Sequence, residues 1–389
     1  MARVPRDAPA AARATVLLFW YNGLIIGVWA ASIPGLRDRL GLDSTRVSIA
    51  LVVLGVFAIS GMQLGGRLAD TFGARRISLS AVPMLMVGLA LIAATGSYAE
   101  LLAGAAVIGF GNGLIDVSMN AIGVQVERHR STPIMSFFHG MWSVGNLAGA
   151  GTVLVAALLV PERAVLLAGE LTAAIGLVAL AVLLRITPET ELVAHVDEAG
   201  AKLPIPPWAW LLGVMAIAFG LGEGTAMDWS GIHLTDVAGV SPAQGSMAVT
   251  VVAGFMVLIR LLGDLLVARF GRQSVVRFGG ACAAAGYFVG SFATTLPLLL
   301  AGWALVGFGI GMIAPQVYAV AGHAGGGRVL AVVVTFGYAT FLAGPAVIGL
   351  CVNLLGIQRA MLVPAVLLSA LPFLATAMPE QGSRTAAAR

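Results

Sequence analysis

The sequence predicts an all-α membrane protein of twelve transmembrane helices, built as two pseudo-symmetric six-helix halves. Three observations predict this class: a composition unlike that of soluble proteins, a series of membrane-length apolar runs, and an internal repeat. Of the 389 residues, 59% are hydrophobic and 10% are charged, whereas a soluble domain carries about 25% charged residues. A soluble fold of this size would lack the polar side chains needed to cover its surface, and a lipid-facing surface removes that need.

Apolar runs long enough to cross a bilayer recur along the whole chain. A crossing needs roughly 20 apolar residues. We predict spans at 14–34, 47–69, 77–97, 101–126, 133–160, 163–184, 208–233, 244–268, 275–294, 298–321, 329–354 and 359–378. Prolines are expected to mark several boundaries, at Pro34, Pro133, Pro161, Pro207, Pro242 and Pro297.

The first apolar segment has an alternative interpretation as a signal peptide, because Arg3, Arg6 and Arg13 precede it. The segment is long for a signal peptide, and no small-residue cleavage site follows it. Its counterpart in the internal repeat, 208–233, is an ordinary internal span. We therefore expect the first segment to be retained as a transmembrane helix.

The placement of lysine and arginine predicts the orientation. With a cytoplasmic N-terminus, 16 of the 22 Lys and Arg residues fall on the cytoplasmic side and Arg260 falls within a span. Five fall outside: Arg37, Arg39, Arg46, Arg163 and Arg359. Because cytoplasmic loops carry an excess of these residues, we expect both termini in the cytoplasm and an even number of spans.

A charged segment divides the chain near its middle. Residues 185–207 hold the densest cluster of acidic side chains and end in three prolines, Pro204, Pro206 and Pro207. We predict an N-terminal six-helix half at 1–184, a cytoplasmic linker at 185–207, a C-terminal half at 208–378 and a cytoplasmic tail at 379–389.

The two halves match at a constant offset of 198 residues. Residues 106–113 (AVIGFGNG) recur as 304–311 (ALVGFGIG), and Gly41 and Gly73 recur as Gly239 and Gly271. Three separate blocks in the same register, without a gap, favour a true duplication. Parallel repeats of six helices are typical of transporters whose solute site lies near the membrane midplane.

The loop between the second and third predicted spans carries a recognisable motif. Residues 66–76 read GRLADTFGARR, which resembles the major facilitator superfamily signature G-x-L-A-D-x-x-G-x-R-R. The resemblance implies the major facilitator fold and transport by alternating access. It also implies a gating role for Gly66, Asp70, Gly73, Arg75 and Arg76, against the alternative of an ordinary positively charged cytoplasmic loop.

The second half departs from this motif. Ala268 stands at the position that corresponds to Asp70, and an acid occurs instead at Asp264, four residues after Arg260. Residues four apart share one helix face. Asp264 is therefore either a local ion-pair partner of Arg260 or a displaced part of the gating loop.

Shorter segments resemble a bacterial inner-membrane subgroup near the fucose-permease-like members. These segments are 116–120 (DVSMN), 136–140 (SFFHG) and 222–224 (GEG). The resemblance implies a sugar-like solute and the bacterial cytoplasmic membrane. The fifth span reads GNLAGAG at 145–151 and lacks the Gly-Pro pair of similar drug antiporters, which disfavours drug efflux without excluding it.

Two acids are predicted near the middle of spans. A carboxylate at that depth costs about 2.5–3.5 kcal/mol on insertion scales, so it should face a cavity or a partner. Asp116 lies in a polar stripe with Asn112 and Asn120, each four residues apart, and its repeat counterpart is Ala314. Glu223 lies between two glycines, and its counterpart is Ile25. Each is expected to couple protons or bind solute, or else to be a buried acid bonded to its neighbours.

Three further polar residues lie within spans. Arg260 could hold an anionic solute group, or pair with Asp264 or Glu223. His139 could exchange protons near neutral pH, or be a satisfied core histidine. Asn22 could bond a hydroxyl-bearing solute, or join two helices. Asp228, beside Trp229, is interpreted as part of the outer aromatic belt.

The same residues exclude several other functions. No G-x-x-x-x-G-K-[ST] loop is present, the five histidines and two cysteines form no cluster that predicts a metal or catalytic site, and the arginines form no basic stripe for nucleic acid. We expect no cofactor, no metal and no enzyme activity. The predicted protein is a monomeric secondary transporter that moves a small organic solute, coupled to protons. Efflux of amphipathic drugs or metabolites is the alternative, ahead of a membrane sensor or an intramembrane enzyme.

Overall fold

A computed structural model of the chain describes residues 8–128, 134–187 and 205–379. In this part of the chain, twelve helices are long and apolar enough to cross a membrane. They fall close to the twelve segments predicted from the sequence, so the predicted all-α membrane fold is confirmed. The chain divides into two compact units, Met1–Glu198 with Ser241–Ala253, and Ala199–Val240 with Gly254–Arg389.

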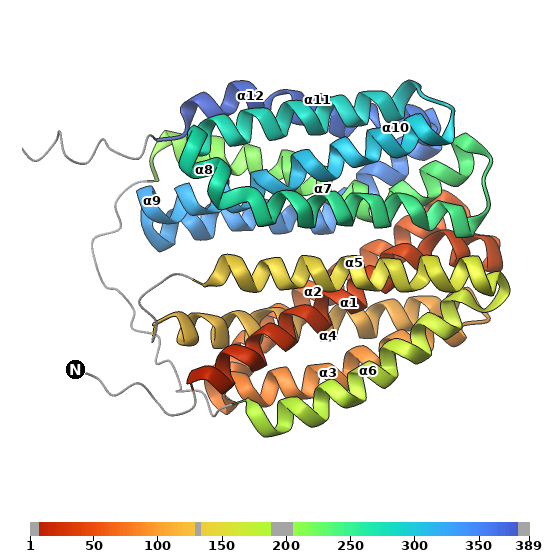
Figure 1. Cartoon of the computed structure of the whole chain (residues 1–389), viewed down its shortest axis with the longest axis horizontal. Helices are drawn as coiled ribbons and strands as arrows, with labels where there is room; N and C mark the ends of the chain where they lie inside the picture. Colours follow the sequence, from red (N-terminus) through yellow and green to blue (C-terminus); the bar gives the residue numbers. More distant parts are fainter. Residues whose placement is uncertain (1–7, 129–133, 188–204, 380–389) are drawn as a thin grey trace, which may run out of the picture. The chain divides into compact units, whose positions relative to one another are not determined.

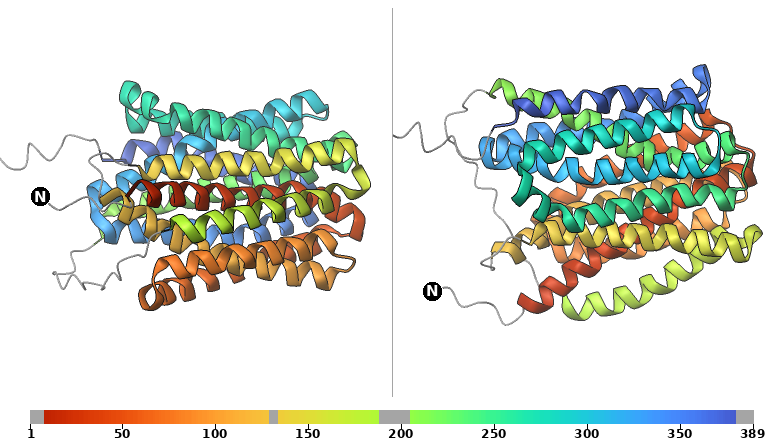
Figure 2. Two further views of the ribbon diagram at one scale, coloured as in Figure 1. Left: turned by 60° about the horizontal axis from the view of Figure 1, so that its bottom comes forward. Right: turned by 45° about the horizontal axis from the view of Figure 1, so that its top comes forward.

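The first unit contains six long helices that run back and forth along one direction (Figures 1 and 2). They are α1 (Ala8–Leu40), α2 (Ser44–Phe72), α3 (Ala74–Ala94), α4 (Tyr98–Arg128), α5 (Met135–Leu159) and α6 (Ala164–Ile186), with the short helix η1 (Pro161–Arg163) before α6. Within this unit, α1 packs extensively against α5, and α2 against α4.

The second unit contains the remaining spans, several of which are merged or broken. Its helices are α7 (Pro207–Ala238), α8 (Pro242–Phe292), α9 (Leu296–Leu355), α10 (Ile357–Ala360), α11 (Leu362–Ser369), α12 (Leu371–Leu374) and η2 (Ala375–Ala377). The first residues of α8 belong to the first unit. Helices α8 and α9 each contain two spans, and α10 to η2 together make the last one, Ile357–Ala377.

Proline positions agree with the prediction except at one helix. Pro161, Pro207 and Pro242 begin helices, and Pro297 lies in the first turn of α9, while Pro133 lies outside the described residues. Pro34 was predicted to end the first span, but it lies inside α1, which continues to Leu40. A proline is tolerated there because surrounding groups in a packed membrane helix can satisfy the carbonyl that it leaves free.

Glycines with positive φ confirm the internal repeat in three dimensions. Gly41 and Gly239 have φ of 60° and 65°, and Gly73 and Gly271 have φ of 85° and 76°. Each pair is separated by the same 198 residues as the sequence match. Only glycine adopts this conformation without strain, so the duplicated sequence places equivalent turns at equivalent positions of both units.

Small residues allow close helix contacts in the first unit. A Cβ atom on Gly145 would collide with the carbonyl oxygen of Trp20, and one on Gly149 with that of Leu24. Gly109 and Gly113 approach the backbone of α2 in the same way. These backbones touch because nothing larger than hydrogen separates them.

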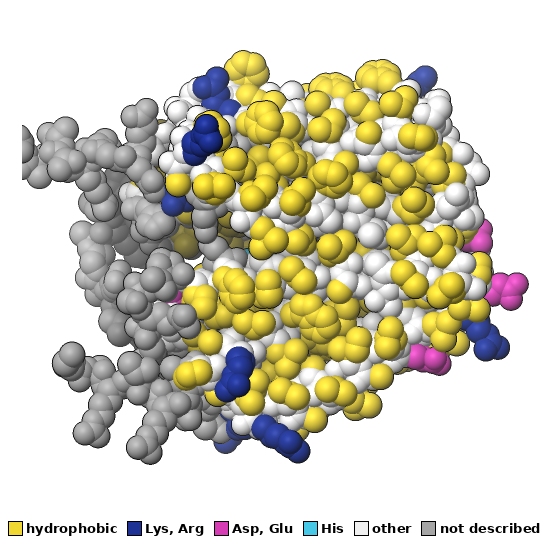
Figure 3. All heavy atoms as spheres, in the orientation of Figure 1, with side chains coloured by type: hydrophobic (Ala, Val, Ile, Leu, Met, Phe, Trp, Pro, Cys, Tyr) yellow, Lys and Arg dark blue, Asp and Glu magenta, His cyan; other side chains and the backbone are white. Residues whose placement is uncertain are grey.

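The outer surface of the helices is apolar. Figure 3 shows a face covered largely by hydrophobic side chains, with the charged side chains near the helix ends. Exposed residues on this kind of surface include Leu177 and Val178 of α6 and Phe373 of α12. Contiguous exposed apolar side chains along membrane-length helices are expected to contact lipid.

Candidate functional site

The predicted polar stripe of α4 is present in the first unit. The side-chain amide of Asn120 donates to the backbone carbonyl of Asp116 at 2.8 Å and to its carboxylate Oδ1 at 3.3 Å. Asp116 and Asn120 are half-buried. Asn120 therefore contacts both the backbone and the side chain of Asp116 across one turn of α4.

A chain of side-chain hydrogen bonds joins three helices of this unit. Trp142 of α5 donates through Nε1 to Oδ1 of Asn22 in α1 at 2.7 Å, and Asn22 donates through Nδ2 to Oδ1 of Asn112 in α4 at 2.7 Å. Asn22 is only 2% exposed. The spacing within α4 predicted the stripe, but nothing in the sequence indicated that Trp142 and Asn112 would share Asn22.

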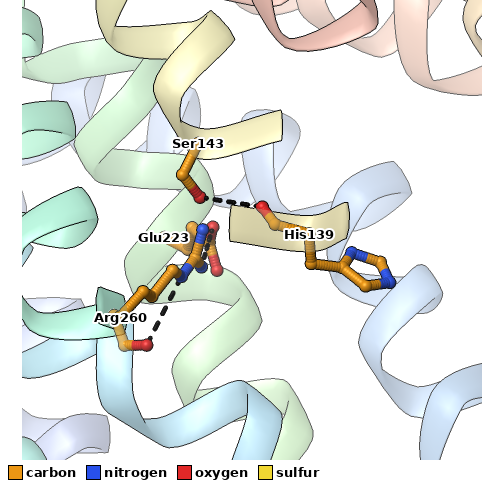
Figure 4. Close-up of polar contacts among 5 residues, drawn as sticks. His139, Ser143, Glu223 and Arg260 are labelled. Atoms are coloured by element: carbon orange, nitrogen blue, oxygen red, sulfur yellow. Dashed lines mark hydrogen bonds and ion pairs between the residues drawn. The ribbon is translucent and has the colours of Figure 1, made fainter. Parts of the chain in front are cut away.

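An ion pair lies within the spans of the second unit. Arg260 Nη2 lies 3.3 Å from Glu223 Oε1, with side chains 15% and 18% exposed, and Arg260 Nε donates to the carbonyl of Gly311 at 3.4 Å. Figure 4 shows the two side chains meeting from α8 and α7. Of the two partners considered for Arg260, Glu223 makes the pair, while the side chain of Asp264 lies outside the described atoms.

Among the residues predicted to bind solute or protons, all of which are described, only His139 is well exposed. Its ring packs edge-on against Phe19, with centroids 5.1 Å apart. Its backbone carbonyl accepts a hydrogen bond from Ser143 at 3.2 Å, as drawn in Figure 4. The exposed imidazole is therefore not a buried core histidine.

The signature loop forms a tight turn between α2 and α3. Gly73 provides the positive φ at this turn, after Gly66 and Asp70 in the last turns of α2. Arg75 donates to the carbonyl oxygens of Thr187 at 2.7 Å and Leu184 at 3.2 Å, so it caps the C-terminal end of α6. Asp70 and Arg76 are exposed. The gating roles of this loop stay predictions.

One prediction about α7 is wrong. Trp229 was placed with Asp228 in an outer aromatic belt, but Trp229 is only 1% exposed. Both residues line a cavity of about 20 Å³ between α7 and α9, whose wall also includes Thr225, Thr340 and Gly344. A tryptophan in a membrane-interface belt faces lipid and headgroups, whereas this one is packed inside its unit.

No group of three or more His, Cys, Asp or Glu side chains that could hold a metal ion occurs within residues 8–128, 134–187 and 205–379. Cys282 and Cys351 are free thiols.

The sequence profile of the Major Facilitator Superfamily matches residues 15–224, more than half of the chain. The chain belongs to the major facilitator superfamily. It is therefore a multi-pass membrane transporter and not an enzyme.

Relatives in this superfamily cover most of the chain. It is 33% identical over 354 residues to an uncharacterized MFS-type transporter of Yersinia pestis, covering 89% of this chain and 90% of the relative. It is 32% identical over 339 residues to an uncharacterized transporter of Sinorhizobium fredii, covering 85% and 88%. Membrane protein MosC of Rhizobium meliloti is 28% identical over 358 residues, covering 90% and 85%.

Solved structures of transporters share the fold. The nucleoside transporter NupG superposes with a TM-score of 0.72 at 13% identity, covering 94% of this chain and 100% of that one. A human organic anion transporter superposes with a TM-score of 0.67 at 17% identity, covering 95% and 99%. At these identities the likeness shows the superfamily fold and does not specify a solute.

Proposed function

We propose that this superfamily member is a proton-coupled secondary transporter that moves a small polar organic solute across the bacterial inner membrane by alternating access. The observation that carries the proposal is the ion pair of Glu223 and Arg260 within membrane-spanning helices. Their counterparts in the repeat are Ile25 and Met62. The duplicated scaffold thus forms without these charges, which argues for a functional reason to keep them.

The energetics favour a role in coupling. A charge at membrane depth is costly, so intramembrane ionisable residues mark ion or solute pathways. Protonation of Glu223 would remove the negative partner of Arg260 and free the guanidinium to bind a polar or anionic group of the solute. Protonation of Asp116, held by Asn120, is the second candidate coupling step. A proton crossing 100 mV supplies about 2.3 kcal/mol, enough to drive accumulation.

A sequence resemblance and two aromatic side chains support the proposed solute class. The segments that resemble fucose-permease-like members favour a sugar-like solute, and the half-buried side chains of Trp20 and Trp142 can stack on a sugar ring. A screen should therefore begin with sugars, and include nucleosides, organic anions and amphipathic drugs.

The test is uptake into proteoliposomes with an imposed pH gradient, after a thermal-shift screen has selected the solute. Glu223→Gln should lower gradient-driven accumulation by on the order of tenfold or more, because a coupled proton supplies about 2.3 kcal/mol per 100 mV. Asp116→Asn tests the second acid, and Glu170→Gln, an exposed acid of α6, is the matched control. Full gradient-driven accumulation by both Glu223→Gln and Asp116→Asn would contradict the proposal.

A further inference from the structure

The cavity beside Asp228 lies between α7 and α9. Its wall includes Gly220, Gly344 and Thr340. The counterpart of Gly220 in the repeat is Asn22, which in the first unit accepts a hydrogen bond from Trp142. Glycine at this position leaves the second unit without that amide.

The helix pair around the cavity also differs in sequence from its counterpart. Gly23 and Gly27 let the backbones of α1 and α5 touch. The residues at the same positions of α7 are Leu221 and Thr225, both of which line the cavity. The wall of the cavity is thus built partly from side chains that the first unit lacks.

Asp228 places a carboxyl group at this cavity. Its counterpart in the repeat is Ala30. In the described part of the chain, no group donates a hydrogen bond to Asp228 and no cation pairs with it, whereas Glu223 has Arg260 and Asp116 has Asn120. A carboxylate without a donor or a cation is the costly case within a membrane.

The neighbouring polar groups fit a bound proton together with one water molecule. Thr225 donates its hydroxyl proton to the carbonyl of Leu221, and Thr340 donates to that of Gly337, so both oxygens are left as acceptors. A cavity of about 20 Å³ is large enough for one water, which needs two to four polar partners.

In the described part of the chain, no charged or titratable group on the helices packed around Asp228 neutralises its carboxyl group. From α8, Tyr287 interacts electrostatically with Asp228 and Glu223, but its hydroxyl donates to the carbonyl of Gly222 at 2.6 Å. Arg260, also of α8, pairs with Glu223. Helix α9 contributes Thr340, α11 has no titratable side chain, and Arg359 of α10 is exposed.

We propose that Asp228 and the cavity between α7 and α9 form a proton-binding site, in which the Asp228 carboxyl takes up a proton through one water held by Thr225 and Thr340. The water gives one proton to the Asp228 carboxylate and receives one from the aqueous phase, so one O–H bond of the water breaks as the carboxyl O–H bond forms, and the water is regenerated. The inference deepens the proposed function, since it adds a proton carrier separate from the Glu223–Arg260 pair.

Infrared difference spectroscopy of the full chain in lipid nanodiscs tests the site with protons as the only ligand. The wild type should show an acid-induced carboxyl C=O band that shifts in D₂O, is absent from Asp228→Asn, and changes frequency in Thr340→Val. Asp236→Asn, an exposed acid on the same helix, should leave the band unchanged. If Asp228→Asn does not fold, Asp228→Glu should keep the band and shift its frequency.

Two results would overturn the site. One is an identical carboxyl spectrum for the wild type, Asp228→Asn and Asp228→Glu. The other is stabilisation of the wild type, but not of Asp228→Asn, by NaCl relative to choline chloride, because the ligand would then be a metal cation. A wild type with this band but without pH-gradient-driven uptake would instead contradict the proposed transport mechanism, so the two failures are distinguishable.

Discussion

The contact of α1 with α5 in the first unit and that of α7 with α9 in the second descend from the same duplicated sequence but are built differently. In the first, glycine backbones touch and Trp142, Asn22 and Asn112 form a neutral hydrogen-bonded chain. In the second, a water-sized cavity, an unpaired acid and a nearby ion pair occupy the same region. One repeat has kept a tight scaffold while the other has gained ionisable groups.

The difference between the two contacts indicates where functional groups can be added to a duplicated fold. A tightly closed interface tolerates no added volume, so its polar groups must bond one another. An interface with a cavity of about 20 Å³, lined in part by Leu221 and Thr225, has room for one water and for protonation. We therefore expect the first unit to be sensitive to changes of volume and the second unit to changes of charge.

The largest loss of stability is expected from a side chain added at the contact of α1 with α5. Gly145→Val should destabilise the protein by about 3 kcal/mol or more, because overpacking costs 1–3 kcal/mol and the added atoms would meet backbone of α1. Ala343→Val, at an exposed position of α9, is the control and should change little. Thermal unfolding of the purified variants measures both, and equal tolerance would break the comparison.

Removing one partner of the ion pair in the second unit should cause the next largest loss of stability. Arg260→Gln leaves Glu223 without its partner, and Glu223→Gln leaves Arg260 without its own. The double variant should recover part of the loss, with a coupling energy of about 1–3 kcal/mol. A double-mutant cycle of unfolding free energies tests this, and additive losses would mean that the 3.3 Å pair contributes no net stability.

The smallest loss of stability is expected from removing one hydrogen bond of the Trp142–Asn22–Asn112 chain in the first unit. Trp142→Phe removes the donor to Asn22 and should cost about 0.6–1.7 kcal/mol, the range measured for hydrogen bonds between membrane helices. Thr340→Val, at the α9 side of the cavity in the second unit, should cost less, since the Thr340 hydroxyl bonds only within its own helix. Unfolding in the same detergent compares the two, and a larger loss for Thr340→Val would reverse the assignment of roles.

Much of the fold followed from local sequence. The twelve apolar runs predicted the twelve spans because a bilayer demands a fixed length of apolar helix, and Gly41, Gly73, Gly239 and Gly271 predicted equivalent turns because only glycine adopts their φ. Pro34 misled the prediction, since whether a proline ends a helix depends on what neighbouring helices offer to the freed carbonyl.

The candidate sites were only partly predictable. Asn112, Asp116 and Asn120 lie within one helix, so their spacing sufficed to place them on one stripe. The partnership of Arg260 with Glu223, 37 residues apart, could be named only as one of two alternatives.

Membrane insertion, the number of crossings and the repeat of the two halves could all be predicted from the amino-acid sequence, because hydropathy and glycine φ are properties of single segments. The hydrogen bonds on both sides of Asn22, the burial of Trp229 and the place of Asp228 at a cavity emerged from the packing of the helices. Those outcomes depend on which side chains of other helices fill or leave the space beside them, and no single segment carries that information.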